Sequence, residues 1–375
     1  MKAPTPISAD SLDPSAVHQL LTLSAVGLRN MFIPARGLFC HRLIETKTGL
    51  VPEGLSHRYT MMTILGLNRY EKSGYPIPFR LRDLTAELVR KVDWLAGMGD
   101  LGLLLWTCAE VTPELLEDCI ENTGALAAPK RLAAARAATT MELAWFLTGI
   151  AKVILANPAQ RTVWQEVART SLALLRLNQR PSGFFGHVAT ATGPRGWLRG
   201  RIGSFADQVY PIFALSSFGE AFQEGEALAL ANACARAICR VQGPLGQWWW
   251  HYDALNGRVI QRYPVYSVHQ DGMAPMALLA LSRVTGRDFN GPILKGLQWI
   301  LGHNELGQDM REQAHRTIWR SIRFTSRSRL LQHELRFWLR SEIEGAPANV
   351  LTVLRECRPY HLGWLLYALA SHRGT

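Results

Sequence analysis

The segments RYTMMTILGL (58–67), GLLLWTCAE (102–110) and MELAWFLTGI (141–150) share one pattern, in which a polar or aromatic start leads into a strongly apolar run. The pattern returns in FADQVYPIFALSSF (205–218), SVHQDGMAPMALLAL (267–281) and RPYHLGWLLYALA (358–370). A helix that is apolar on all sides must be buried between neighbours. The six segments therefore predict six buried helices.

Amphipathic segments lie between most of these runs, at residues 81–95, 162–177, 224–241 and 292–301. An amphipathic helix can lie outside a buried one, so the alternation predicts helical hairpins with an inner and an outer member. Hairpins that cannot bury their apolar faces alone must stack or close into a ring. We therefore expect an all-α fold: a single (α/α)6 toroid domain spanning residues 1–375.

Two segments define how the ring is completed. The last apolar run has no amphipathic helix after it, and the helix predicted at 15–31 can supply that partner. Residues 302–350 fit the repeat poorly and predict an extra helical hairpin. The spacing of Arg316, Arg320, Arg323 and Arg327 would place these arginines on one helix face. Strand signals are nearly absent, apart from one hairpin expected in 248–265 around Asn256-Gly257.

Composition excludes several classes of protein. The chain has 375 residues, 48% hydrophobic and 19% charged, with a net charge of +11, so it can bury a large core. No apolar run approaches the roughly 18 residues of a membrane helix, and MKAPTPISAD at the start has no apolar signal segment. The six cysteines are scattered without a CxxC pair, as expected of reduced thiols in a cytoplasmic protein.

The partner and cofactor predictions follow from missing motifs. The sequence has no HExxH and no Cys/His set at ligand spacing, so we expect no metal and no cofactor. It also lacks a helix-turn-helix or zinc finger, so we expect no specific nucleic acid. The sequence predicts no transmembrane segment and leaves peripheral membrane contact open, because the net charge is positive.

The six apolar runs and their aromatic starts resemble the six-hairpin (α/α) toroid superfamily. Its members include glucoamylase-like glycosidases, unsaturated glucuronyl hydrolases, sugar 2-epimerases and uronyl epimerases. The prenyltransferase and squalene-cyclase toroids are similar at this level. No family-specific catalytic motif matches, so the resemblance implies the fold and a ligand-binding mouth but assigns no catalytic residue.

In such a toroid the loops before the inner helices converge on one mouth. The stretch 246–275 is the richest of these loops in aromatic and polar side chains, and aromatic faces bind sugar rings or isoprenoid chains. Near its end, His269, Asp271 and Tyr266 are candidates for acid–base chemistry. The binding candidates in this stretch are Trp248, Trp249, Trp250, Tyr252, Asp253 and Gln270.

A second loop, 185–211, is rich in glycine and arginine and leads into Asp207, Gln208 and Tyr210. Arg195 and Arg199 would grip the carboxylate or phosphate of an anionic ligand. The position of Asp207 corresponds to that of Asp271 in the later repeat. Two carboxylates facing one cavity are what glycoside hydrolysis requires, so this correspondence predicts a catalytic pair.

Other helix starts offer further mouth residues in the same register. The binding candidates there are His57, Arg58, Tyr59, Arg358 and Tyr360, and Glu53, Asp100, Glu142 and His361 occupy comparable positions. Any one of these residues alone is more often a structural group than a ligand contact. Their recurrence at the same point of several repeats is what favours a site.

These features predict a carbohydrate-active enzyme for an anionic, uronate-containing saccharide. A hydrolase would use both aspartates, whereas a lyase or epimerase would use a tyrosine or histidine base with arginine beside the carboxylate. One alternative is an isoprenoid cyclase or prenyltransferase, although the DxDD and DDxxD motifs are absent. A third is a non-catalytic accessory protein of polysaccharide assembly.

Overall fold

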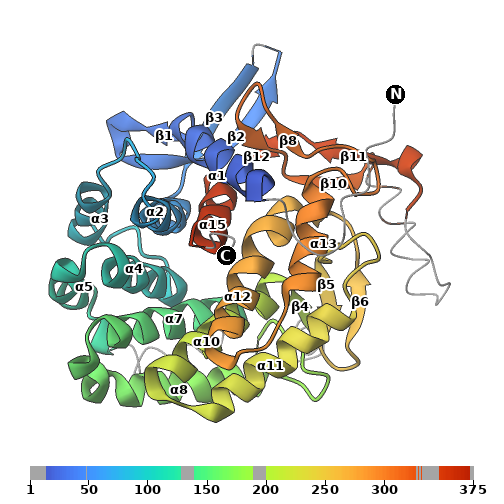
Figure 1. Cartoon of the computed structure of the whole chain (residues 1–375). Helices are drawn as coiled ribbons and strands as arrows, with labels where there is room; N and C mark the ends of the chain where they lie inside the picture. Colours follow the sequence, from blue (N-terminus) through green and yellow to red (C-terminus); the bar gives the residue numbers. More distant parts are fainter. Residues whose placement is uncertain are drawn as a thin grey trace.

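The computed structural model describes residues 14–47, 49–127, 139–188, 200–326, 328, 331 and 346–371. Six inner helices form a ring in which each packs against the next, and the last packs against the first (Figure 1). They are α2 (His57–Lys72), α4 (Met98–Val111), α7 (Thr140–Ala156), α10 (Ala206–Phe222), α12 (Ala274–Thr285) and α15 (Pro359–Leu369). A π-helical turn, η5 (His269–Met273), leads into α12. The fold is the predicted (α/α)6 toroid.

The outer helices pack against this ring and complete the hairpins (Figure 1). They are α1 (Pro14–Arg29), α3 (Leu81–Arg90), α5 (Leu116–Thr123), α8 (Arg161–Asn178), α11 (Gly225–Arg240) and α13 (Asn290–Ile300). Helix α1 packs against α15, as expected of the segment that completes the last hairpin. Short 3-10 helices occur in the connections, at η1 (Pro34–Arg36), η2 (Pro113–Leu115), η3 (Ala125–Ala127), η4 (Pro158–Gln160) and η6 (Ala348–Val350).

Glycines let the inner helices approach closely at two places. A Cβ on Gly102 of α4 would lie 2.4 Å from the backbone of Phe146 on α7, and one on Gly66 of α2 would lie 2.0 Å from the carbonyl oxygen of Gly363 on α15. Real Cβ atoms do not come this near to backbone, so only glycine fits at these crossings. The two glycine contacts therefore set how tightly the ring closes.

Short strands precede several inner helices. Antiparallel β2 (Leu38–Thr46) and β3 (Gly49–Leu55) lead into α2, and β1 (Phe32–Ile33) and β12 (Glu356–Cys357) pair with β2. The expected hairpin forms as β5 (His251–Asp253) and β6 (Arg258–Gln261), with β4 (Ile202–Ser204) beside β5. The β2–β3 hairpin was not predicted. These strands lie at the N-terminal end of the inner helices, which we call the mouth.

The region 302–350 differs from expectation. Its described part forms β8 (Arg311–Glu312), β9 (Thr317–Ile318) and β10 (Ser321–Phe324), and β10 pairs with β7 (Val265–Tyr266) and β11 (Leu351–Leu354). The predicted arginine helix face is wrong, because Arg316 has a φ of 53° and Arg323 lies in β10. β-Branched residues, which favour strands, occur in β9, β10 and β11 as Thr317, Ile318, Ile322, Thr352 and Val353. Arg327 and most of 327–345 lie outside the described residues, where the extra hairpin stays a prediction.

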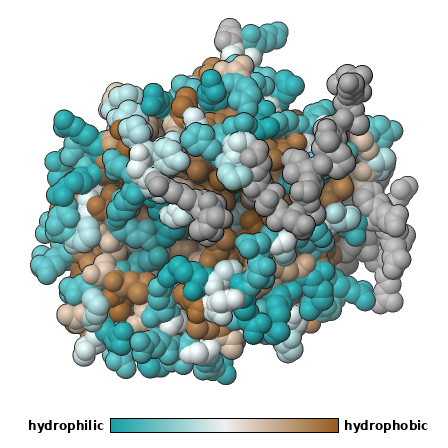
Figure 2. All heavy atoms as spheres, in the orientation of Figure 1, coloured by the Kyte–Doolittle hydropathy of each residue, from teal (hydrophilic) through white to brown (hydrophobic). Residues whose placement is uncertain are grey.

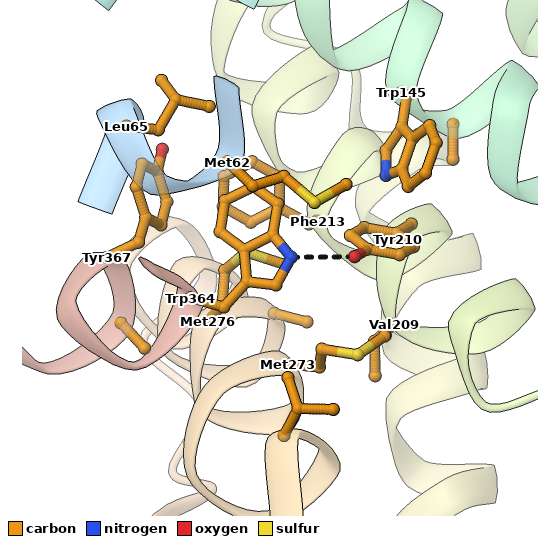
Figure 3. Packing of buried hydrophobic residues seen from close by; sticks show 14 of the residues in the cluster. Met62, Leu65, Trp145, Val209, Tyr210, Phe213, Met273, Met276, Trp364 and Tyr367 are labelled. Atoms are coloured by element: carbon orange, nitrogen blue, oxygen red, sulfur yellow. Dashed lines mark hydrogen bonds between the residues drawn. The ribbon is translucent and has the colours of Figure 1, made fainter. Parts of the chain in front are cut away.

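The axis of the ring is filled with aromatic side chains rather than open. Trp106, Tyr210, Phe213, Trp364 and Tyr367 form a cluster that we call the aromatic plug (Figure 3). The indole nitrogen of Trp364 donates a hydrogen bond of 2.9 Å to the hydroxyl of Tyr210, which satisfies both buried groups. The plug gives the mouth a closed floor.

The face of the molecule seen in Figure 2 is mainly hydrophilic, and hydrophobic residues show among the hydrophilic ones toward its centre. Among the described residues, no helix has the length and apolar character that crossing a bilayer requires.

Candidate active site at the mouth of the toroid

Three arginines and three tyrosines gather at the mouth from distant parts of the chain. Arg358 donates from Nη1 to the hydroxyl of Tyr59 over 2.9 Å, and the ring of Tyr59 lies 4.5 Å from that of Tyr360. The guanidinium of Arg320 lies 4.9 Å from the centre of the Tyr266 ring. We call Arg58, Arg320, Arg358, Tyr59, Tyr266 and Tyr360 the arginine–tyrosine cluster.

One buried carboxylate organises the cationic side of this cluster. Glu356 accepts from Nε of Arg358 at 2.7 Å and also pairs with Arg320 at 3.3 Å and Arg42 at 3.2 Å. Burial alone would raise the pKa of Glu356, but the arginines hold it below its ordinary value. Glu356 therefore stays ionised and fixes two mouth arginines, while their combined positive charge exceeds its own.

Tyr266 and Tyr360 serve as hydrogen-bond donors at neutral pH, because both keep their hydroxyl protons. Burial raises the pKa of Tyr360 to about 12, although Arg320 and Arg358 act to lower it. Burial also raises the pKa of Tyr266. The cluster thus offers protonated hydroxyls beside guanidinium groups, an arrangement suited to a carboxylate or another anion.

Arg58 extends this region toward α4 and α7. Its Nε donates to Oδ1 of Asp100 at 2.7 Å, and its guanidinium carbon lies 5.1 Å from the centre of the Trp145 ring. Trp145 packs edge-on against Tyr210, as Figure 3 shows, and its buried Nε1 has no hydrogen-bond partner among the described residues. A buried N–H without an acceptor costs about 1–3 kcal/mol, so Trp145 is ready to donate to a ligand.

Asp207 lies in the first turn of α10 and is fully buried. Its Oδ2 accepts from the backbone N and the hydroxyl of Ser204 at 2.9 and 2.8 Å, and contacts Nδ1 of His187 at 3.0 Å. In the part of the chain that the structure describes, its Oδ1 has no hydrogen-bond partner. The side chain of His187 is 24% exposed, so the pair offers an accessible imidazole held by a buried carboxylate.

His187 was not identified from the sequence. It lies in a loop whose arginines were the predicted ligand contacts. Its contact with Asp207 joins positions 20 residues apart, which the sequence alone does not reveal. Its only local signal was its place near the start of the glycine- and arginine-rich loop 185–211.

Asp271 is also fully buried, but its environment differs. Both of its carboxylate oxygens contact Nε2 of His361, at 2.8 and 2.9 Å. Burial would lower the pKa of His361, yet the carboxylate of Asp271 raises it to about 9. The pair is therefore an ion pair that ties η5 to α15, below Arg358 and Tyr360. The structure does not present Asp271 as an open carboxylate facing Asp207.

His269 lies against Phe205 and Tyr266, with ring centres 4.5 and 5.2 Å away. Burial lowers its pKa to about 3, so the imidazole is neutral. His57 stacks on Trp94 at 5.0 Å, and burial lowers its pKa too. Both histidines lie at the predicted end of the toroid as uncharged groups.

The tryptophan run divides between core and mouth. Trp248 is fully buried against Phe205, and Nε1 of Trp249 donates to the carbonyl of Val241 at 3.0 Å, so both belong to the core. Trp250 is partly exposed and packs edge-on against Tyr266, 5.5 Å away. Of the three, Trp250 alone is placed to contact a ligand at the mouth.

Four other binding candidates are occupied by structural contacts. Gln208 exchanges hydrogen bonds with the backbone of Phe185, at 2.8 and 2.9 Å. Gln270 similarly accepts from the backbone N of Trp248 at 3.2 Å. The repeated glutamine is thus a staple that attaches each loop to its inner helix. Tyr252 stacks on Phe184, and Asp253 pairs with Arg201.

Two further acids also have local partners. Glu142 caps α7 by accepting from the backbone and hydroxyl of Thr139, and Glu53 pairs with Arg42 on the exposed β2–β3 hairpin. Arg195 and Arg199 lie outside the described residues. Within the described ranges, no group of three or more His, Cys, Asp or Glu side chains could hold a metal ion.

The ring of helical hairpins defines the class of fold. Several solved structures share this fold. An unsaturated glucuronyl hydrolase from Streptococcus agalactiae in complex with dGlcA-GalNAc6S is 12% identical, with a TM-score of 0.61 over 99% of this chain and 97% of that one. An unsaturated glucuronyl hydrolase specific for heparin is 14% identical, with a TM-score of 0.54 over 95% of each chain.

A glycosyl hydrolase family 88 protein from Bacteroides vulgatus is 10% identical, with a TM-score of 0.58 over 96% of this chain and 98% of that one. No family model and no curated protein matches the sequence. At these identities the likeness establishes the (α/α)6 toroid fold.

Proposed function

We propose that this protein is a carbohydrate-active enzyme that binds an anionic, uronate-containing saccharide at the mouth of the toroid. The observation that carries the proposal is the arginine–tyrosine cluster, in which Arg358 contacts Tyr59 and Arg320 contacts Tyr266, while Arg58 lies beside Tyr59 in the first turn of α2. Several inner helices also begin at the mouth, where the positive ends of helix dipoles favour an anion.

The site also suits the neutral part of a saccharide. Trp250 is a partly exposed aromatic side chain at the rim, and sugar rings stack on such side chains through their C–H surface. The unpaired Nε1 of Trp145 and Oδ1 of Asp207 are buried polar atoms that a hydroxyl-rich ligand could satisfy. The fold neighbours named as unsaturated glucuronyl hydrolases support the same substrate class.

For the chemistry, we assign proton transfer to His187 and its orientation to Asp207. His187 would take the proton from the carbon beside the uronate carboxylate, and the arginines would stabilise the enolate-like charge that forms. Elimination then expels the group on the adjacent carbon, whereas in epimerisation an acid on the opposite face, such as a tyrosine hydroxyl of the arginine–tyrosine cluster, donates a new proton to the same carbon. Hydrolysis by Asp207 with Asp271 is less suited, because Asp271 is committed to His361.

The test is to incubate the protein with uronic-acid oligosaccharides in deuterated buffer. Elimination would raise the ultraviolet absorbance as an unsaturated sugar forms, and epimerisation would incorporate deuterium without chain cleavage. New reducing ends without an absorbance rise would show hydrolysis and overturn the assignment of His187. No binding and no turnover with any uronate saccharide would overturn the proposed function itself.

A further inference from the structure

A cavity of about 920 Å³ opens at the end of the toroid opposite the mouth, and we call it the lower cavity. Its walls come from the C-terminal parts of α2, α4, α7, α10 and α12, with Ser371 after α15. The aromatic plug separates it from the mouth, because Tyr210 lies near the arginine–tyrosine cluster while the hydroxyl of Tyr367 donates to Glu110 in the cavity wall at 2.8 Å. A volume of this size is within the range of about 300–1,000 Å³ usual for small-molecule sites.

The lining carries more cationic than anionic side chains. Arg283 pairs with Glu220 through two hydrogen bonds of 2.5 Å, so this pair is neutral. Oε1 of Glu110 forms an ion pair with Nζ of Lys152 at 2.8 Å and accepts a hydrogen bond from the hydroxyl of Tyr367. The lining therefore has four cationic side chains and two carboxylates, an excess of two positive charges. The full set of charged lining residues is Arg69, Lys72, Glu110, Lys152, Glu220 and Arg283.

The negative ends of helix dipoles also meet here, and they account for part of this cationic excess. Nη1 of Arg69 donates to the carbonyl of Tyr367 at 3.1 Å, and Nζ of Lys72 donates to the carbonyl of Glu110 at 2.9 Å. These bonds use Arg69 and one N–H of Lys72 as caps for helix C-termini. If these side chains served only to cap helix C-termini, all of their N–H donors would bond to backbone carbonyls.

Some N–H donors of the cavity lysines do not bond to backbone carbonyls. An ammonium group has three N–H donors. In the described part of the chain, Lys72 and Lys152 each donate one hydrogen bond, so each keeps donors for another acceptor. The side chain of Lys152 is only 11% exposed, which leaves little bulk water to accept from it. The surplus N–H groups of Lys152 therefore favour a ligand rich in acceptors, and the exposed Lys72 can donate to the same ligand as well as to bulk water.

We propose that the lower cavity binds a small molecule through its phosphate or carboxylate group, held by Lys72 and Lys152 with Arg283 adding positive charge at the rim. Such a group supplies several acceptor oxygens on one centre, which matches ammonium donors arriving from α2 and α7. This site is separate from the mouth and independent of the proposed function.

The experiment titrates inorganic phosphate into the full chain and follows thermal unfolding, with potassium chloride at equal ionic strength as the reference. We expect a saturable rise of the unfolding midpoint of about 2 °C at phosphate concentrations near ten times the dissociation constant. Lys72→Gln should lose most of this rise, since Lys72 is exposed and its removal leaves the fold intact. The paired change Glu110→Gln with Lys152→Gln removes the buried charges together and should also lose it.

Two further variants locate the effect. Lys91→Gln removes an exposed lysine of the same type outside the cavity and should keep the full rise. Arg358→Gln alters the mouth and should keep it too. The proposal is overturned if chloride gives the same rise, if both lower-cavity variants keep it, or if Arg358→Gln abolishes it, which would place phosphate at the mouth.

Discussion

Arg358 donates a hydrogen bond of 2.9 Å to the hydroxyl of Tyr59 across 299 positions of the chain. The bond joins the start of the last inner helix to the start of the first. This contact lines the candidate site and also lies where the last inner helix meets the first, which we call the seam. The mouth is therefore complete only when the ring of helices has closed.

We expect Arg358→Gln to weaken uronate binding by about 10- to 100-fold, because a charge-assisted hydrogen bond contributes about 1.5–3 kcal/mol. Isothermal titration with a uronic-acid oligosaccharide measures the dissociation constant. The matched control is Arg82→Gln, an exposed arginine paired with Glu114 away from the mouth, which should bind as the unaltered chain does. Equal affinity in Arg358→Gln would remove the mouth arginines from the ligand site.

His187→Gln should lower turnover by about 100-fold or more, since it removes the group assigned to proton transfer. Asp207→Asn should also lower turnover, because an asparagine does not orient the His187 ring as the carboxylate does. Glu142→Gln is the control, as Glu142 caps the neighbouring inner helix and glutamine can cap in the same way. Full activity in both His187→Gln and Asp207→Asn would refute the assigned roles.

The ion pair of Asp271 and His361 predicts how stability depends on pH. The pKa of His361 rises from 6.5 to about 9 in the fold, so the pair stabilises fully below pH 6.5 and this contribution is lost as pH rises to about 9. The raised pKa of Asp271, caused by burial, has the same sign, with stability lost as pH rises above 3.8.

Urea unfolding of the unaltered chain should show a free energy that falls by roughly 3 kcal/mol over the His361 range. Asp271→Asn should be less stable at neutral pH, and most of its pH dependence in this range should disappear. An equally steep fall in the variant would mean that the pair does not cause it.

Gly102→Ala should destabilise the chain by about 1–3 kcal/mol or more, because its Cβ would meet the backbone of Phe146 at 2.4 Å. Backbone cannot rotate away as a side chain can. Gly291→Ala is the control, since a Cβ there meets nothing within 4 Å. Chemical unfolding of both variants gives the comparison, and equal stability would show that α4 and α7 can separate at no cost.

The ring itself could be predicted because all-round apolar helices have few alternatives to burial. The segments beginning at Arg58 and Arg358 both proved to be inner helices, and the expected helix at 15–31 does pack as the partner of α15. The strands were harder to predict, because β2 carries polar residues on both faces and β3 contains Pro52 and two glycines. Regular arginine spacing in 316–327 suggested a helix, but pairing of β10 with β7 and β11 decides the local structure.

The site was predicted by location better than by residue. Arg58, Tyr59, Arg358, Tyr360, Tyr266 and Trp250 do meet at the mouth, since the start of a helix fixes which end of the ring its first turn occupies. The role of a side chain within that end depends on partners that sequence spacing does not reveal. Arg320 came from a segment expected to be helical, and His187 became visible only through Asp207.

The seam between α2 and α15 also constrains how the chain assembles during synthesis. A ribosome makes α2 some 300 residues before α15. Until α15 has been made, the face of α2 that carries Gly66 lacks the helix against which it packs. Until then the partial ring leaves apolar helix faces in water, where they are open to chaperones and to other nascent chains. The last step of folding is thus the closing of a gap between the two most separated hairpins, and it is the same step that creates the binding mouth.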